Sequence, residues 1–209
     1  DTGGSVRQPA DFCGVIGLKP TYGRISRHGL IAYASSFDQI GIFGSNVPDV
    51  ALLLEVMAGA DGYDSTSAAN PVDAYSDVQA LPSKPLRIGY FKEALESPAL
   101  DTEIGQNILD FTGKLRAEGH TVEAIDFEFL DYIVPAYYIL TTAEASSNLS
   151  RYDGVKYGHR DMGKKDSLTD FYCATLSEGF GWEVKRRIML GTFVLSAGYY
   201  DAYFTKAQQ

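Results

Sequence analysis

The sequence predicts an α/β fold in which a mixed sheet is flanked by helices. Three observations support this class. Residues 86–127 show a strand pattern, an amphipathic helix pattern and a second strand pattern in succession. Another amphipathic helix is predicted at 46–59, and the last third of the chain has mostly helical apolar spacing. A strand, a helix and a strand within about 40 residues form a βαβ unit, whose strands pair in parallel.

The first 45 residues are rich in glycine and are predicted to be irregular, with tight turns between short apolar runs. The first helix is expected at 46–59, because Asn46 is a preferred cap and Gly59 a plausible end. Residues 61–85 contain several proline and glycine breakers and are predicted to form a loop.

The βαβ unit covers about 86–127. Its first strand is predicted at 86–91 and its second at 121–127, where apolar and polar residues alternate. The helix between them is predicted at 101–118 and ends at Gly119. Its apolar residues recur at helical spacing: Ile104, Ile108, Phe111 and Leu115.

The C-terminal part is predicted to be helical. One helix is expected at 135–149, followed by a polar loop at 150–166. Ser167 and Asp170 resemble a capping box. Helices are then expected at 168–178, 181–189 and 191–207.

Composition and charge limit the possible functions. The chain has 209 residues with 27 acidic and 18 basic side chains, a formal charge of −9, which argues against a broad basic face for nucleic acid. No apolar run approaches the ~18 residues that span a bilayer. Two cysteines cannot form a disulfide framework, which favours a reducing, cytoplasmic setting. Cys13 is expected to be a small buried thiol and Cys173 a core residue.

The loop at residues 1–5 carries the residues that are typical of acyl transfer. In Gly3-Gly4-Ser5, consecutive backbone N–H groups lie beside a hydroxyl. A serine hydroxyl attacks a carbonyl carbon, and nearby N–H donors stabilise the oxyanion that forms. The same tripeptide is also common in flexible turns. Because the chain starts inside this loop without a methionine, we expect it to be a piece of a longer protein.

A serine nucleophile needs a base. A Ser5–His28–Asp38 triad is possible, but nothing in the spacing requires it. Lys19 precedes a proline and is expected to be solvated rather than a base. Arg7 is expected to support the loop by pairing with Asp1 or Asp11.

Two other enzyme classes share part of this motif. Asp1-Thr2-Gly3 matches the tripeptide of aspartic proteases, but those enzymes need two such loops and this chain has one. A phosphate-binding glycine loop would need a preceding strand and a lysine in the P-loop position, and neither is visible.

Long motifs resemble the amidase signature family, and within it the tRNA-dependent amidotransferases. They occur throughout the chain, at residues 1–10, 12–21, 22–27, 35–41, 143–157, 183–192 and 198–203. The resemblance implies that 1–209 is a single incomplete amidase signature domain, with upstream and C-terminal parts absent.

The same resemblance implies a Ser–cis-Ser–Lys triad with Ser5 as the acyl-enzyme nucleophile. It places Thr2, Gly3 and Gly4 in the oxyanion loop, and it places the lysine and the cis-serine before Asp1. The isolated chain is therefore expected to have negligible glutaminase activity, because members of a triad act as a unit.

Glutamine is the implied substrate. A guanidinium matches its α-carboxylate with two parallel hydrogen bonds. Arg186 and Arg187 diverge by ~100° on a helix, so only one faces a pocket easily. The resemblance favours Arg186, and it makes Tyr137 a substrate-contacting hydroxyl.

The implied reaction releases ammonia for the conversion of Glu-tRNA(Gln) to Gln-tRNA(Gln). Two other amidotransferase subunits are implied as partners, and one of them is the main contact to Glu-tRNA. No metal or cofactor is implied in this chain, whereas ATP and Mg are implied in one of the partners; no membrane is involved. The alternatives are a noncatalytic module that binds partners, or an amidase of the same family for another small amide.

Overall fold

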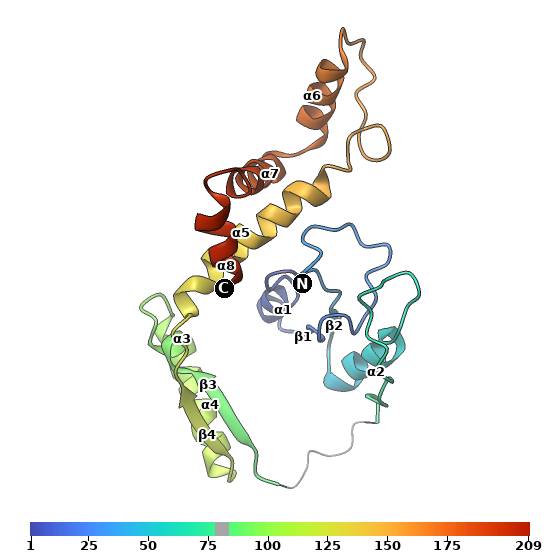
Figure 1. Cartoon of the computed structure of the whole chain (residues 1–209). Coiled ribbons are helices and arrows are strands. Elements are labelled where there is room, and N and C mark those ends of the chain that lie inside the picture. The colour runs from blue at the N-terminus through green and yellow to red at the C-terminus, as the bar shows by residue number, and fades with distance from the viewer. Residues whose placement is uncertain (78–83) are drawn as a thin grey trace. The chain divides into compact units, whose positions relative to one another are not determined.

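The computed structural model describes residues 1–77 and 84–209 (Figure 1). The described residues divide into two compact units. Residues 1–77 and 136–209 form the first unit, and residues 84–135 form the second. Each unit has its own two-stranded sheet, one antiparallel and one parallel. Both α and β elements are therefore present, as the sequence predicted.

The first unit begins with α1 (Arg7–Phe12), β1 (Ile16–Leu18), β2 (Ile42–Gly44) and α2 (Val47–Met57). The strands pair antiparallel, and a small core of Ile25, Ile42 and Val50 lies beside them. The sequence predicted α2, which Asn46 caps by accepting a hydrogen bond from the Asp49 amide at 2.9 Å. It missed α1, β1 and β2, which lie in the stretch predicted to be irregular.

The second unit is the βαβ unit. It contains β3 (Arg87–Phe91), α3 (Lys92–Glu96), α4 (Thr102–Ala117) and β4 (Thr121–Ile125). The strands pair in parallel over their whole length, which confirms the predicted topology. Asp101 caps α4, and Gly119 follows the helix with φ +92°, a conformation that favours glycine. The short helix α3 was not predicted.

The C-terminal helices are α5 (Leu130–Leu149), α6 (Leu168–Gly179) and α7 (Trp182–Val194). Ser167 caps α6 as predicted, because its hydroxyl accepts a hydrogen bond from the Asp170 amide at 3.1 Å. The helix expected at 191–207 is wrong. The chain leaves α7 after Val194 and turns at Gly198 (φ +88°) before the π-helix η1 (Asp201–Thr205) and α8 (Lys206–Gln208).

Helices α5 and α7 approach each other closely where Gly191 lies against α5 (Figure 1). A Cβ atom at Gly191 would overlap the carbonyl oxygen of Thr142 and lie 2.9 Å from the Ser146 Cβ. Because a backbone carbonyl cannot move aside as a flexible side chain can, only glycine fits this crossing.

Gly191→Ala is therefore expected to lower the free energy of unfolding of the full-length protein by about 1–3 kcal/mol. The measurement is a urea unfolding curve. Gly113→Ala is the matched control, because Gly113 lies inside α4 and, among the described residues outside its own helix backbone, no atom lies within 4 Å of an added Cβ. It should raise stability by about 0.5–1 kcal/mol. Equal stability of Gly191→Ala and the parent would contradict the close crossing.

Candidate active site

The Asp1–Ser5 loop immediately precedes α1 and is folded around the carboxylate of Asp1. This carboxylate accepts hydrogen bonds from the backbone amides of Gly4 at 2.6 Å and Val6 at 3.4 Å. It also pairs with Arg7, whose Nε lies 3.1 Å from Oδ2. The Asp1 side chain is 1% exposed, so the predicted support of the loop by Arg7 is confirmed, with Asp1 as its partner.

Gly4 and Ser5 present an open face of this loop. Gly4 has φ +115°, which side chains rarely tolerate, and in the described residues no atom beyond its two chain neighbours lies within 4 Å of the position of a Cβ there. Ser5 is exposed. A ligand carbonyl can therefore approach the backbone at Gly4 and the hydroxyl of Ser5 without obstruction from neighbouring side chains.

A second carboxylate holds the other end of the loop. The Thr2 hydroxyl donates to Asp38 Oδ1 at 2.6 Å. The other oxygen, Oδ2, accepts from the amides of Tyr33 at 2.8 Å and Ala34 at 3.0 Å. Asp38 is 3% exposed. The buried carboxylate thus joins Thr2 to a loop more than 30 residues away in the sequence.

His28 is not placed as a base for Ser5. Its ring stacks on Tyr63 with 4.8 Å between centroids, and within residues 1–77 and 84–209 no hydrogen bond joins it to Ser5 or Asp38. Lys19 donates to the Pro20 carbonyl at 2.7 Å and to Gln39 at 3.3 Å. Neither alternative base is therefore engaged with the Ser5 hydroxyl.

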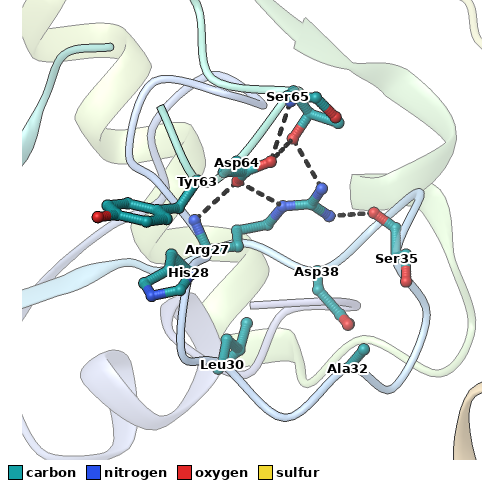
Figure 2. Close-up of a pocket in the computed structure, with 10 residues that line it drawn as sticks. Arg27, His28, Leu30, Ala32, Ser35, Asp38, Tyr63, Asp64 and Ser65 are labelled. Carbon is teal, nitrogen blue, oxygen red and sulfur yellow. Dashed lines mark hydrogen bonds and ion pairs between the residues drawn. The ribbon is translucent and has the colours of Figure 1, made fainter. Parts of the chain in front are cut away.

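His28 and Asp38 instead line a polar pocket of about 240 Å³ (Figure 2). Arg27 crosses this pocket and bonds to Asp64, to the Ser35 carbonyl and to the Thr66 hydroxyl. Hydrogen bonds from Thr66 and Arg27 lower the pKa of Asp64. Ser5 is not among the lining residues, so the pocket is separate from the Ser5 hydroxyl.

Tyr137 of α5 packs against the Asp1–Ser5 loop. A Cβ atom at Gly3 would lie 2.5 Å from the Tyr137 ring atom Cε2. The aromatic ring therefore lies directly on the Gly3 backbone, and Gly3 leaves the space for it. The structure thus brings together two residues that the sequence analysis singled out for different reasons.

The two arginines of α7 differ in their surroundings. Glu183 binds both, at 2.8 Å from Arg186 Nη2 and 2.9 Å from Arg187 Nε, and these bonds lower the pKa of Glu183 to about 2. Arg187 also donates to the Tyr33 hydroxyl at 2.9 Å. Hydrogen bonds to Glu183 and to Tyr33 raise its pKa. Arg187 is thus the less exposed of the two arginines, and it is the one that bonds to Tyr33.

The sequence analysis named both arginines and favoured Arg186 from the resemblance, but helix spacing also carries a signal about which of the two is less exposed. Gly191 and Val194 are the buried positions of α7, and Arg187 precedes them by four and seven residues. Residues at this spacing share one helix face. Arg186 lies on the neighbouring face, where the Glu183 hydrogen bond is the main cause of its raised pKa.

Both cysteine predictions are wrong, because Cys13 and Cys173 are exposed. Cys13 follows the last residue of α1, next to Phe12, which is 79% exposed. On α6 the buried position is Thr175, two residues after Cys173. Positions two residues apart lie on different faces of a helix. The apolar spacing therefore predicted the wrong face of α6 to be buried.

In the described part of the chain, none of the helices has the length and apolar character needed to cross a membrane. Within the same residues, no three His, Cys, Asp or Glu side chains are grouped as ligands for a metal ion.

The family model called Amidase matches residues 1–209, the whole chain. The chain belongs to the amidase family. It is 55% identical over 210 residues to the A subunit of glutamyl-tRNA(Gln) amidotransferase from Chlorobium luteolum, and 55% identical over 209 residues to the same protein from Listeria monocytogenes. Each match covers 100% of this chain and 43% of the relative. This amidase-family chain thus spans less than half the length of the curated relatives it matches.

Solved structures agree with this membership. The A subunit of glutamyl-tRNA(Gln) amidotransferase from Thermotoga maritima superposes with a TM-score of 0.68 at 38% identity, covering 99% of this chain and 40% of that one. A 6-aminohexanoate cyclic dimer hydrolase superposes with a TM-score of 0.70 at 24% identity, covering 99% of this chain and 41% of that one. The second likeness concerns the fold alone. The amidase-family fold expected from the resemblance is therefore confirmed.

Proposed function

We propose that the protein containing this chain hydrolyses glutamine through a seryl acyl-enzyme at Ser5. The observation that carries the proposal is an exposed serine that follows the open Gly4 backbone in a loop held by two buried carboxylates. In the proposed step, Ser5 Oγ bonds to the carboxamide carbon and the C–N bond breaks. The serine proton passes to the departing nitrogen, which leaves as ammonia. Water then releases glutamate.

Backbone N–H groups are the proposed oxyanion donors. Thr2, Gly3 and Gly4 lie beside Ser5 in this loop. The Gly4 N–H already donates to Asp1 Oδ1 at 2.6 Å, so Gly4 shapes the loop and the proposed donors are the N–H groups of its neighbours. Mutational precedent gives each such donor about 3–4 kcal/mol of the activation barrier.

The proton acceptor is proposed to be a lysine acting through a cis-serine in the part of the protein before Asp1. Two contacts support a base from outside this chain: His28 stacks on Tyr63, and Lys19 donates to the Pro20 carbonyl. The 209-residue chain alone is then expected to turn over glutamine at least ~10³-fold more slowly than the whole protein.

The ammonia is proposed to pass to a partner that converts Glu-tRNA(Gln) to Gln-tRNA(Gln) with ATP and Mg. The names of relatives at 55% identity support this role. If another subunit of such a complex binds the tRNA, this chain does not itself need a basic surface for tRNA. Its formal charge of −9 agrees with that arrangement.

The test uses the full-length protein with and without its two proposed partner subunits. Ammonia and glutamate are measured with glutamine as substrate, and with asparagine and butyramide as competing small amides. Preferential turnover of glutamine, and amidation of Glu-tRNA only with the partners present, are the expected results. Preference for another amide, or amidation that does not need this protein, would overturn the proposal.

A further inference from the structure

We propose that Asp38 is a positioning residue that fixes the Asp1–Ser5 loop for catalysis through its bond to the Thr2 hydroxyl. The inference rests on the proposed function, because it concerns the geometry of the same nucleophile. The sequence analysis considered Asp38 only as a partner of His28, and the structure does not join these two residues by a hydrogen bond.

The carboxylate of Asp38 is fully engaged. Its three hydrogen bonds come from one side chain, that of Thr2, and from two backbone amides, those of Tyr33 and Ala34. Hydrogen bonds to a charged acceptor are about twice as strong as neutral ones. Because Asp38 is buried, water cannot easily replace a lost donor, so the Thr2 hydroxyl is held in one position.

The Tyr33–Asp38 loop is itself fixed to α5. The side-chain amide of Asn148 donates to the Tyr33 carbonyl at 3.2 Å and to the Ser35 hydroxyl at 3.1 Å. The carboxylate of Glu144 accepts from the Ser36 amide at 2.9 Å. Asp38 therefore connects the Asp1–Ser5 loop to a 20-residue helix, a rigid element.

The same helix and loop also hold the other candidate site residues. The Tyr33 hydroxyl lies 3.2 Å from Thr141 Oγ1 of α5 and accepts a hydrogen bond from Arg187 of α7. Tyr137 of α5 packs on Gly3. The bond between Thr2 and Asp38 thus sets the position of the oxyanion donors relative to the side chains that would contact the substrate.

Without this bond, the loop keeps the packing of Tyr137 on Gly3 and the bonds of the Asp1 carboxylate to the Gly4 and Val6 amides. These contacts do not hold the Thr2 side chain, and the ion pair of Asp1 is with Arg7, which is 57% exposed. Exposed ion pairs hold geometry weakly. Misplacement of reacting groups by about 1 Å costs about 10²-fold in rate. Loss of the Thr2 hydroxyl should therefore reduce kcat more than it changes KM.

The experiment compares Thr2→Val, Thr2→Ala and Thr2→Ser in the full-length protein assembled with its partner subunits. We expect Thr2→Val and Thr2→Ala to lower kcat for glutamine by about 10–100-fold with KM within about threefold. Thr2→Ser keeps the hydroxyl and should restore most of the rate. Rates are normalised to the Ser5 sites that a serine-directed phosphonylating reagent titrates, so that partial misfolding does not imitate the effect.

Thr175→Val is the matched control. Thr175 is 1% exposed, and its hydroxyl accepts a hydrogen bond from the Asp161 amide at 3.3 Å. The substitution therefore also removes a buried threonine hydroxyl and its bond, but away from the loop. It should lower thermal stability and leave normalised kcat unchanged.

Three results would overturn the inference. They are a normalised kcat within about twofold of the parent for both Thr2→Val and Thr2→Ala, an equal loss in Thr175→Val, or a failure of Thr2→Ser to restore the rate. A failure of the proposed function is distinguishable, because the parent protein would then prefer another amide, or Ser5→Ala would retain turnover of glutamine.

Discussion

Replacing Ser5 with alanine in the full-length, assembled protein is expected to lower kcat for glutamine by about 10⁶-fold. Ser5 supplies the oxygen that bonds to the carboxamide carbon, and alanine has no group that replaces it. Residual hydrolysis should come from water that attacks a substrate bound at the oxyanion donors. In other enzymes, catalysis of this kind persists after the nucleophile is removed. The measurement is release of ammonia under saturating glutamine.

Ser150→Ala is the control for this substitution. Ser150 is also exposed, and its hydroxyl donates to the Ser147 carbonyl at 2.6 Å after the end of α5. It should retain full turnover. A phosphonylating reagent should attach to Ser5 in the parent and in Ser150→Ala, as a mass shift on the peptide that contains residue 5. Turnover by Ser5→Ala at the parental rate would place the nucleophile elsewhere.

The parts of the fold that sequence predicts well are those with sustained local periodicity. The 16-residue helix α4 shows its apolar face along its length, and Asp101 and Gly119 mark its ends. Strands β3 and β4 follow from its position, since a short crossover forces parallel pairing. These signals need no knowledge of distant residues.

The missed elements are too short to show a period. Strands β1 and β2 have three residues each, and α1 has six. Their positions depend on contacts such as that of Gly17, where a Cβ would lie 2.6 Å from the Ala10 Cβ. The turn that follows α7 depends on the positive φ of Gly198. Local apolar spacing does not show whether the chain continues as a helix or turns at this residue.

The site was predicted in the same uneven way. The nucleophile loop is visible in Gly3-Gly4-Ser5, because both the donors and the hydroxyl lie in one short motif. Its anchors are distant in sequence, and no spacing rule connects Thr2 with Asp38 or Gly3 with Tyr137. Sequence therefore located the candidate nucleophile and the nearby support from Arg7, and could not derive from spacing the anchors that are distant in sequence.

The choice between the two arginines of α7 yields the second large effect. We expect Arg187→Lys to raise KM for glutamine by about 10–100-fold, because lysine keeps the charge and loses the planar pair of donors that matches a carboxylate. Arg187 has five N–H donors and uses one on Glu183 and one on Tyr33, so others remain for a substrate. Arg186→Lys should leave KM within about threefold, in contrast to the assignment that the resemblance favours.

A substrate lacking the α-carboxylate separates recognition from general damage. With 4-aminobutanamide, which keeps the carboxamide and an amino group, the parent and Arg187→Lys should have similar kcat/KM values, since no carboxylate is left for the guanidinium to bind. If Arg187→Lys impairs both substrates equally, Arg187 acts by supporting Tyr33 and does not recognise the carboxylate. If only Arg186→Lys discriminates between the substrates, the carboxylate partner is Arg186, and glutamine approaches from the exposed face of α7.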